Sequence, residues 1–259
     1  MAIYKDLEKQ VEIFEEELKR MQSGILRDLE NYVNSTFKTK NGKYILDEGT
    51  DLTVDMTAKL QEVLAENGYY ETVNEQLFDF NQEILANRLG EFPRIAPDFA
   101  TEQLDALLRA NFETLSGVSA NTGNNLKRLL INSLVQNESV SQLAQKFSDE
   151  LEKNLINHSA TLMRTSRRMY YQEIENVIAE SIDDEIIWVY AGAPLQGNSH
   201  QECIWALTAK PHTPYFTQAE KEEFEAGTLP AGLDRSAVRY NCQHYFQITS
   251  LTRKEYEKK

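Results

Sequence analysis

Apolar residues spaced by three and four positions recur along most of the chain and predict long amphipathic helices. The clearest helix covers residues 3–35, where the apolar positions follow the heptad spacing of a coiled-coil seam. A seam of this length needs a partner helix, which comes either from the same chain or from a neighbouring subunit. We expect packing within the chain, with a homo-oligomer through this helix as the alternative. The seam consists of Leu7, Val11, Phe14, Leu18, Met21 and Ile25.

Turn signals divide the helical part of the chain. Asn41 and Gly42 predict a hairpin, because this pair suits the two positive-φ positions of a tight β-turn. Helical spacing then resumes and continues to a break marked by Pro93. We therefore expect a helical region with a coiled-coil-like first helix over residues 1–92, and a second helical region over 93–184.

Within the second region the sequence predicts four helices. Glycines predict a loop at residues 117–123 between the first two of them. Ser139 and Gln142 fit a capping box that opens the next helix. Apolar spacing then predicts a long helix over residues 157–182.

The pattern changes after residue 184. Residues 185–193 are β-branched, aromatic and apolar and predict a strand, and residues 245–249 predict a second one. Thr217 and Glu220 fit a capping box at the start of a short helix between them. The sequence therefore predicts a mainly α protein, in which a long-helix N-terminal region is followed by a small α+β module over residues 185–259.

Composition and charge narrow the class of protein. The chain has 259 residues, of which 41% are hydrophobic, and this is enough for a folded core. No apolar run approaches the roughly 20 residues that a membrane span needs, and the charged, amphipathic start does not resemble a signal peptide. We expect no membrane span and folding in the cytoplasm.

The net charge of −14 is concentrated in the first part of the chain, where residues 1–150 hold 26 acidic and 15 basic residues. Such a surface repels phosphate backbones, so broad nucleic-acid binding is disfavoured there. Arg164, Arg167 and Arg168 leave two interpretations open. They provide a local contact with nucleic acid, or they form an ordinary solvated helix face, and we favour the second.

The two cysteines of the chain each have a histidine at metal-ligand spacing. His200 precedes Cys203 by three positions, and His244 follows Cys242 by two. Zinc takes four tetrahedral nitrogen and sulfur ligands, and two cysteines with two histidines form a closed structural set. Cys-x-His is tighter than the usual knuckle spacing. Buried core thiols and a disulfide therefore stay open as alternatives, the disulfide being disfavoured by a cytosolic environment.

Both His/Cys pairs lie beside predicted strand ends. If the two strands are neighbours in one sheet, the four side chains of His200, Cys203, Cys242 and His244 come together. A metal ion there would close a long loop in a module that has little core of its own, which is how small units are commonly stabilised. We therefore expect a structural zinc ion as the cofactor.

Short motifs in the second half of the chain resemble a known family. Residues 129–147, LLINSLVQNESVSQLAQKF, and 160–173, ATLMRTSRRMYYQE, stand where that family has a helix pair followed by a helix with an Arg-Thr pair. A Trp-containing strand follows, matched around Trp188, then a cysteine knuckle and a closing "NCRC", matched by residues 241–244. The order resembles the minor head proteins of tailed bacteriophages, the Mu F-like head morphogenesis family, over residues 126–250.

The chain departs from the family pattern at informative positions. His200 and His244 stand where the family has cysteines. Because histidine replaces cysteine as a zinc ligand, both exchanges favour the metal interpretation. Asn198 replaces an acidic residue before the knuckle, and Ser166 replaces the glutamate of the Arg-Thr-Glu motif. Any family role of those two positions therefore does not carry over.

The resemblance implies a structural, non-enzymatic virion component. Such a protein is assembled in the host bacterial cytoplasm, contacts the portal and other capsid proteins, lies near packaged DNA and serves head morphogenesis and genome delivery. One alternative is a host-directed protein that presents a zinc knuckle to a cellular partner. Another is a hydrolase that uses zinc or a cysteine nucleophile. A catalytic zinc keeps one coordination position open, whereas four ligands argue for a closed site.

Overall fold

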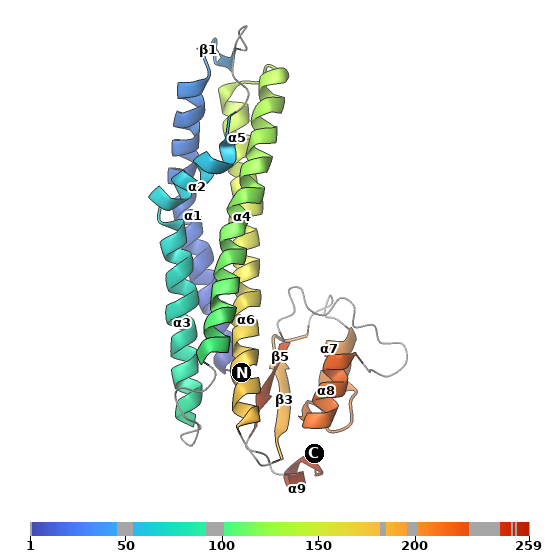
Figure 1. Ribbon diagram of the computed structural model, residues 1–259. Coiled ribbons are helices and arrows are strands. Elements are labelled where there is room, and N and C mark those ends of the chain that lie inside the picture. Colours follow the sequence, from blue (N-terminus) through green and yellow to red (C-terminus); the bar gives the residue numbers. More distant parts are fainter. Residues whose placement is uncertain are drawn as a thin grey trace. The chain divides into compact units, whose positions relative to one another are not determined.

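The computed structural model is mainly helical with a small sheet, as the sequence predicts (Figure 1). It describes residues 2–45, 54–91, 101–181, 185–195, 201–227, 244–249, 251 and 253–258. The chain forms two compact units that interleave in sequence. One contains residues 9–79 and 109–163, and the other contains residues 1–8, 80–108 and 164–259. The boundary predicted at residues 92 and 93 lies outside the described residues.

The first of these units, residues 9–79 with 109–163, is a helical bundle with one apolar core. Val11, Phe14, Leu18 and Ile25 of the predicted seam are each at most 1% exposed and belong to this core. The prediction that the seam packs within the chain is therefore confirmed for these four positions. The helices that contribute are α1 (Ala2–Thr36), α2 (Met56–Glu66), α3 (Tyr69–Glu91), α4 (Thr101–Val135), α5 (Val140–Glu150), the π-helix η1 (Leu151–Ile156) and α6 (Asn157–Glu180).

The predicted hairpin follows α1. Strand β1 (Thr39–Lys40) pairs with β2 (Lys43–Tyr44) around Asn41 and Gly42, whose φ angles are 53° and 72°. Two positive φ angles define the type I′ turn, whose twist matches that of a hairpin, and glycine and asparagine tolerate them best. The hairpin prediction is confirmed.

The predicted loop at residues 117–123 is wrong, because α4 runs through it without interruption. Gly123 has a packing role instead. A Cβ atom at this position would lie 2.6 Å from the Cα atom of Thr57, which is closer than real Cβ contacts. The glycine therefore lets α4 approach the first turn of α2. The loop prediction failed because it treated Gly123 as a helix breaker and not as a residue needed for close packing.

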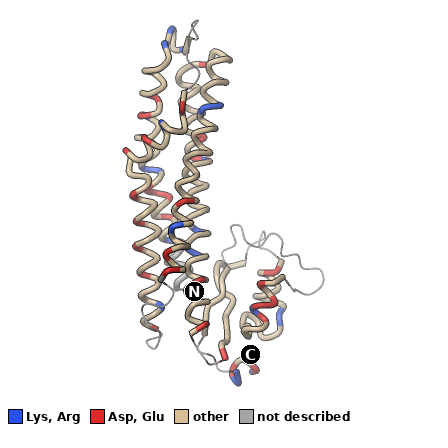
Figure 2. The backbone as a smooth tube through the Cα atoms, in the orientation of Figure 1, with Lys and Arg blue, Asp and Glu red and all other residues tan. Residues whose placement is uncertain are grey.

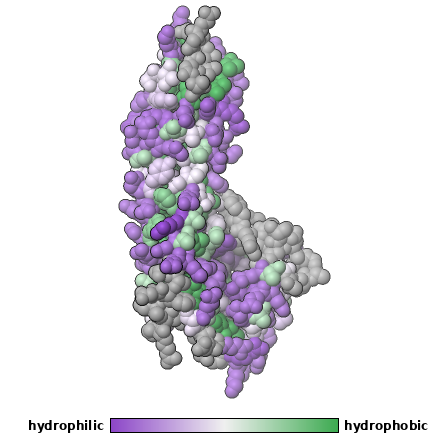
Figure 3. All heavy atoms as spheres, in the orientation of Figure 1, coloured by the Kyte–Doolittle hydropathy of each residue, from purple (hydrophilic) through white to green (hydrophobic). Residues whose placement is uncertain are grey.

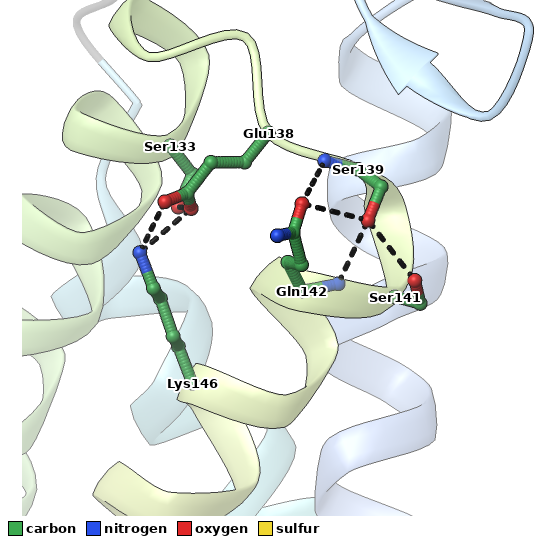
Figure 4. A network of polar contacts seen from close by, with 6 residues as sticks. All are labelled: Ser133, Glu138, Ser139, Ser141, Gln142 and Lys146. Carbon is green, nitrogen blue, oxygen red and sulfur yellow. Dashed lines mark hydrogen bonds and ion pairs between the residues drawn. The ribbon is translucent and has the colours of Figure 1, made fainter.

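The capping box at the start of α5 is confirmed (Figure 4). The Ser139 hydroxyl accepts from the backbone N–H of Gln142, whose side chain accepts from the backbone N–H of Ser139. Beside it, both carboxylate oxygens of Glu138 lie 2.7 Å from the Lys146 ammonium. The hydroxyl of Ser133 also donates to Glu138, so this carboxylate is satisfied locally.

The unit of residues 1–8, 80–108 and 164–259 contains a three-stranded antiparallel sheet in the order β4-β3-β5. Residue pairs Trp188 with Phe216 and Trp188 with Ile248 set its register. Both predicted strands are confirmed, and they pair with each other, which the sequence analysis stated only as a condition for the four ligands to meet. The elements are β3 (Ile187–Gly192), α7 (Gln201–Thr208), β4 (Tyr215–Thr217), α8 (Gln218–Ala226), β5 (His244–Ile248) and α9 (Arg253–Tyr256).

Aromatic rings form the core of this sheet module. Tyr190, Phe216, Phe224 and Phe246 come from β3, β4, α8 and β5, and every pair among them has ring centroids within 6.1 Å. All four side chains are at most 4% exposed. Tilted and edge-to-face pairs of this kind contribute beyond the area that they bury. The aromatic cluster therefore joins all three strands to α8.

Helix α6 covers the outer edge of β5. The side chain of Gln172 accepts from the backbone N–H of Phe246 at 2.8 Å, and the carboxylate of Glu175 accepts from that of Ile248 at 2.8 Å. Glu175 is fully buried and also forms two hydrogen bonds with the Arg88 guanidinium of α3, at 2.6 and 2.9 Å. One carboxylate thus joins two helices to the sheet.

Two of the three arginines of α6, Arg164 and Arg167, have partners inside the protein. Arg164 lies 3.1 Å from the carboxylate of Glu8, and both side chains are about four-fifths buried. Arg167 is 1% exposed, with its guanidinium 4.3 Å from the centroid of the Phe80 ring. The solvated-face interpretation is therefore wrong for Arg167, because its cation packs on an aromatic ring inside the protein.

The described surface is mostly polar on the face drawn in Figure 3. Val135, Met169 and Ile204 are the large apolar side chains reported as exposed among the described residues. Within the same part of the chain, no helix has the length and hydropathy needed to cross a bilayer.

Candidate metal centre

Two of the four predicted ligands belong to described parts of the structure. Cys203 is the third residue of α7, and His244 is the first residue of β5. His200 and Cys242 lie outside the described residues. The sequence analysis missed α7, and the first His/Cys pair was expected to be a knuckle beside a strand. Because an eight-residue helix gives only two turns of periodicity, this element has a weak sequence signal.

Tyr190 of β3 brings the two described ligands into one neighbourhood. Its hydroxyl lies 3.4 Å from the sulfur of Cys203. Its ring stacks on the His244 imidazole, with the centroids 5.5 Å apart and the planes 16° from parallel. The contact with His244 follows from the register, because β5 pairs with β3, whereas Cys203 comes from helix α7 outside the sheet. Tyrosine is not among the usual ligands of zinc, and Tyr190 was not singled out from the sequence.

The imidazole of His244 is oriented by the backbone. Its Nε2 atom lies 2.9 Å from the carbonyl oxygen of Ala193. A carbonyl only accepts hydrogen bonds, so Nε2 carries the proton, and the lone pair belongs to Nδ1. Metal-binding histidines are commonly held in this way, with one ring nitrogen donating to a carbonyl and the other facing the metal. The geometry at His244 therefore fits a zinc ligand.

Cys203 is fully buried on α7. Burial fits a structural zinc thiolate and a core thiol equally well. The disulfide alternative depends on Cys242, which lies outside the described residues, so all three alternatives stay open for this side chain. A catalytic cysteine needs access to substrate, and burial at 0% exposure therefore favours a structural use.

No group of three or more His, Cys, Asp or Glu side chains is gathered in metal-binding geometry among the described residues. Only two of the four predicted ligands, Cys203 and His244, belong to the described residues. A group of three ligands from the predicted site therefore cannot be found there. Cys203 and His244 have the donor chemistry that zinc prefers. Zinc at these four positions remains a prediction.

A second polar cluster lies beside the aromatic core, at Phe216. The ammonium of Lys210 donates to the carbonyls of Pro211 and Tyr215 and to the carboxylate of Glu220, at 2.9 to 3.0 Å. It also lies 4.4 Å from the centroid of the Phe216 ring. All three of its hydrogen-bonding positions are thus used, which allows a cation to be 6% exposed.

Glu220 has three donors around its carboxylate. The Lys210 ammonium, the backbone N–H of Thr217 and the hydroxyl of Tyr256 all donate to it. Burial by itself raises the pKa of this carboxyl, but these hydrogen bonds and the lysine charge outweigh it and lower the pKa below its ordinary value. The capping box of Thr217 and Glu220 was predicted from the sequence, but its links to Lys210 and Tyr256 were not.

A second buried lysine, Lys221 of α8, lies over the ring of Trp188. The ammonium of Lys221 lies 4.6 Å from the Trp188 ring centroid and 2.8 Å from the Glu225 carboxylate. The indole N–H of Trp188 donates to Gln218 at 2.7 Å. Both buried lysines of the module, Lys210 and Lys221, are therefore held by a carboxylate and an aromatic ring.

Comparison with known proteins gives no relative on which to base a function. No family model matches the chain, and no curated protein or solved structure matches it. The functional argument therefore rests on the residues and on the geometry described above.

Proposed function

We propose that this chain is a structural minor head protein of a tailed bacteriophage. It acts in head morphogenesis and genome delivery, where it contacts the portal, other capsid proteins and packaged DNA. The observation that carries this proposal is the packing of the segments that resemble the family. The helix with Arg164-Thr165 holds the edge of β5 through Gln172 and Glu175, and β5 pairs with the Trp188 strand.

A structural zinc ion stapling the sheet module is part of the proposal. Its support is the backbone-oriented imidazole of His244 and the buried thiol of Cys203, which share Tyr190 as a neighbour. His200 and Cys242 supply the other two ligands. A closed site of this kind fixes the loop between the two strands and provides no open position for catalysis.

Particle composition tests the head-protein proposal. Particles of the phage that carries this gene are purified by density gradient and analysed by quantitative mass spectrometry. We expect the chain in DNA-filled particles at a copy number comparable with that of the portal. A chain found only in the soluble fraction of infected cells would refute the proposal and favour the host-directed alternative.

Elemental analysis tests the zinc site. We expect about one zinc per chain in the reduced wild-type protein and loss of zinc in Cys203→Ser, Cys242→Ser, His200→Ala and His244→Ala. His212→Ala is the matched control, because His212 lies in the same module but packs against Tyr256, 4.7 Å between centroids. Wild-type protein without zinc would refute the staple and leave the particle test unaffected.

A further inference from the structure

The chain contains two Asn-Gly pairs, at residues 41–42 and 67–68. This dipeptide is chemically reactive, because the backbone nitrogen of a glycine can attack the preceding asparagine side chain with no Cβ atom in the way. The local sequence gives both pairs the same chemistry. The structure gives them different surroundings, although both lie in the unit of residues 9–79 with 109–163.

The first pair forms the turn of the β1–β2 hairpin. Asn41 and Gly42 are both exposed, and a Cβ atom built on Gly42 would meet no other atom within 4 Å. Within the described part of the chain, neither the Asn41 side chain nor the Gly42 N–H takes part in a hydrogen bond. The attacking nitrogen and the amide that it attacks are therefore both accessible to water, and no hydrogen bond has to break before they react.

The second pair is held at the C-terminal end of α2. The amide nitrogen of Asn67 donates to the Asp28 carboxylate at 3.0 Å and to the carbonyl of Val63 at 2.9 Å. The N–H of Gly68 donates to the carbonyl of Ala65 at 3.1 Å. Both reacting groups of this pair are thus occupied, so hydrogen bonds must break before the nitrogen can reach the amide carbon.

We propose that Asn41 is a site of spontaneous deamidation, and that Asn67 is protected from the same reaction by its hydrogen bonds. The Gly42 nitrogen forms a bond to Cγ of Asn41, the bond from Cγ to Nδ2 breaks, and the proton of the Gly42 nitrogen leaves with Nδ2 as ammonia. One water molecule then opens the succinimide ring at either of its carbonyls. The product is an aspartate or an isoaspartate at position 41, and water is the only co-reactant. The inference does not depend on the head-protein function.

The isoaspartate product changes the backbone of the hairpin. Its main chain runs through the former side chain, which lengthens the turn by one carbon atom. Because loop length sets the register of a hairpin, the pairing of Lys40 with Lys43 is disturbed. The carbonyl of Gly42 also accepts from the N–H of Val140 at 2.9 Å, so the longer turn displaces an acceptor at the start of α5.

Both products add a negative charge at the tip of the hairpin. Figure 2 shows basic residues at this end of a chain whose helices carry many acidic ones. The new carboxylate lies in the turn between Lys40 and Lys43, which face each other across the hairpin. Ion-exchange chromatography therefore separates the modified chain from the unmodified one by charge.

Peptide mapping by mass spectrometry tests the inference on the full chain, incubated at mildly alkaline pH. The method measures conversion at both asparagines in the same sample. Because the hydrogen bonds of the second pair must open first, we expect conversion at Asn67 to be roughly 10- to 100-fold slower than at Asn41. Incubation in concentrated urea is the control, since unfolding removes these hydrogen bonds and should make the two rates similar.

Two outcomes of this experiment would overturn the inference. Equal rates at Asn41 and Asn67 in the folded chain would show that the hydrogen bonds at α2 do not protect. Conversion at Asn41 that occurs only in urea would show that the hairpin turn itself protects the pair.

A variant of α1 tests the protection of Asn67 separately. Asp28→Ala removes one acceptor from its amide, and we expect conversion at Asn67 to rise ~5-fold or more in the folded chain. Conversion at Asn41 should not change. Glu12→Ala is the matched control, because Glu12 is an exposed acidic residue of the same helix, and both rates should stay at their wild-type values. An unchanged rate at Asn67 in Asp28→Ala would contradict the protective role of this hydrogen bond.

Hydrogen exchange tests the consequence for α5. Aged wild-type protein should exchange faster than fresh protein at the start of this helix, where the N–H of Val140 loses its acceptor. Asn41→Gly, aged in parallel, should keep the exchange of fresh protein, because glycine also suits the positive φ at this position and provides no amide to react. Equal exchange by fresh and aged wild-type protein, at full conversion of Asn41, would overturn the structural consequence.

Discussion

The buried carboxylate of Glu175 provides the sharpest test of the fold, because it joins α3, α6 and β5. In Glu175→Gln the side-chain oxygen still accepts from the N–H of Ile248, but the negative charge beside Arg88 is lost. The Arg88 side chain is 4% exposed and Glu175 is fully buried. Removal of one partner from a buried ion pair typically costs about 3–5 kcal/mol, because the other charge stays buried.

Two features of the site move the expected loss to the lower end of this range. Arg88 keeps a second ion pair with Glu91, whose side chain is 60% exposed. The variant glutamine also retains the acceptor for β5, so no backbone N–H is left without a partner. We therefore expect a loss of about 3 kcal/mol in the free energy of unfolding of the unit that contains the sheet.

Urea unfolding followed by tryptophan fluorescence measures this loss. Both tryptophans of the chain, Trp188 and Trp205, belong to the unit that contains Glu175, so the signal reports on that unit. Glu180→Gln is the control, because Glu180 is exposed on the same helix and its change is expected to cost less than about 0.5 kcal/mol.

A double variant separates the buried charge from the lost hydrogen bonds. Arg88→Met with Glu175→Gln removes the unpaired cation while keeping the acceptor for β5. Since uncharged replacements of buried ion pairs are often neutral, we expect it to recover more than about 1 kcal/mol over Glu175→Gln. A single variant as stable as the Glu180→Gln control, or a double variant no more stable than the single one, would refute the reasoning.

Three further predictions concern packing, pH and metal. Gly123→Ala should lower the free energy of unfolding by about 1–3 kcal/mol, because the new methyl group clashes with Thr57. Gly117→Ala should raise it by about 0.5–1 kcal/mol, because its new Cβ meets no atom within 4 Å. Thermal melts should therefore show a lower melting temperature for the first variant and a higher one for the second, and shifts of the same sign would contradict this. Because the folded pKa of Glu220 is lowered, its contribution is present above the ordinary pKa of 4.5 and is lost as pH falls through the lowered value. The melting-temperature advantage of wild type over Glu220→Gln should therefore shrink from pH 6 to pH 3, and a constant difference would contradict this. Chelation should increase protease cleavage within residues 185–250 and leave the N-terminal helices intact; equal digestion with and without chelator would contradict the zinc staple.

The sequence predicts regular elements well where local chemistry decides them. Spacing of apolar residues locates α1, and Asn41-Gly42 locates the hairpin turn, because each signal acts over only a few neighbouring residues. The capping boxes at Ser139 and Thr217 are correct for the same reason. The mainly helical class follows from these local signals, whereas the pairing of β3 with β5 was only a condition of the zinc hypothesis.

Long-range contacts decide the features that the sequence does not reveal. Gly123 reads as a break in a helix, and only its approach to Thr57 explains it as a packing residue. Arg167 reads as part of a solvated face, but its aromatic neighbour Phe80 is more than 80 positions away. Tyrosine is not a usual zinc ligand, and the position of Tyr190 between Cys203 and His244 depends on the pairing of β3 with β5 and on the packing of α7. Such roles come from tertiary contacts that no local pattern encodes.

The cover that α6 provides for β5 has a consequence during synthesis. An uncovered edge strand is a template for pairing with other chains, and His244–Ile248 is rich in aromatic and apolar residues. Because chains are made from the N-terminus, Gln172 and Glu175 leave the ribosome before the strand whose N–H groups they bind. Helix α6 thus covers the edge of β5 as the sheet forms and prevents that edge from pairing with other chains. A fragment that begins at residue 185 lacks helix α6 and is expected to self-associate through the uncovered edge of β5.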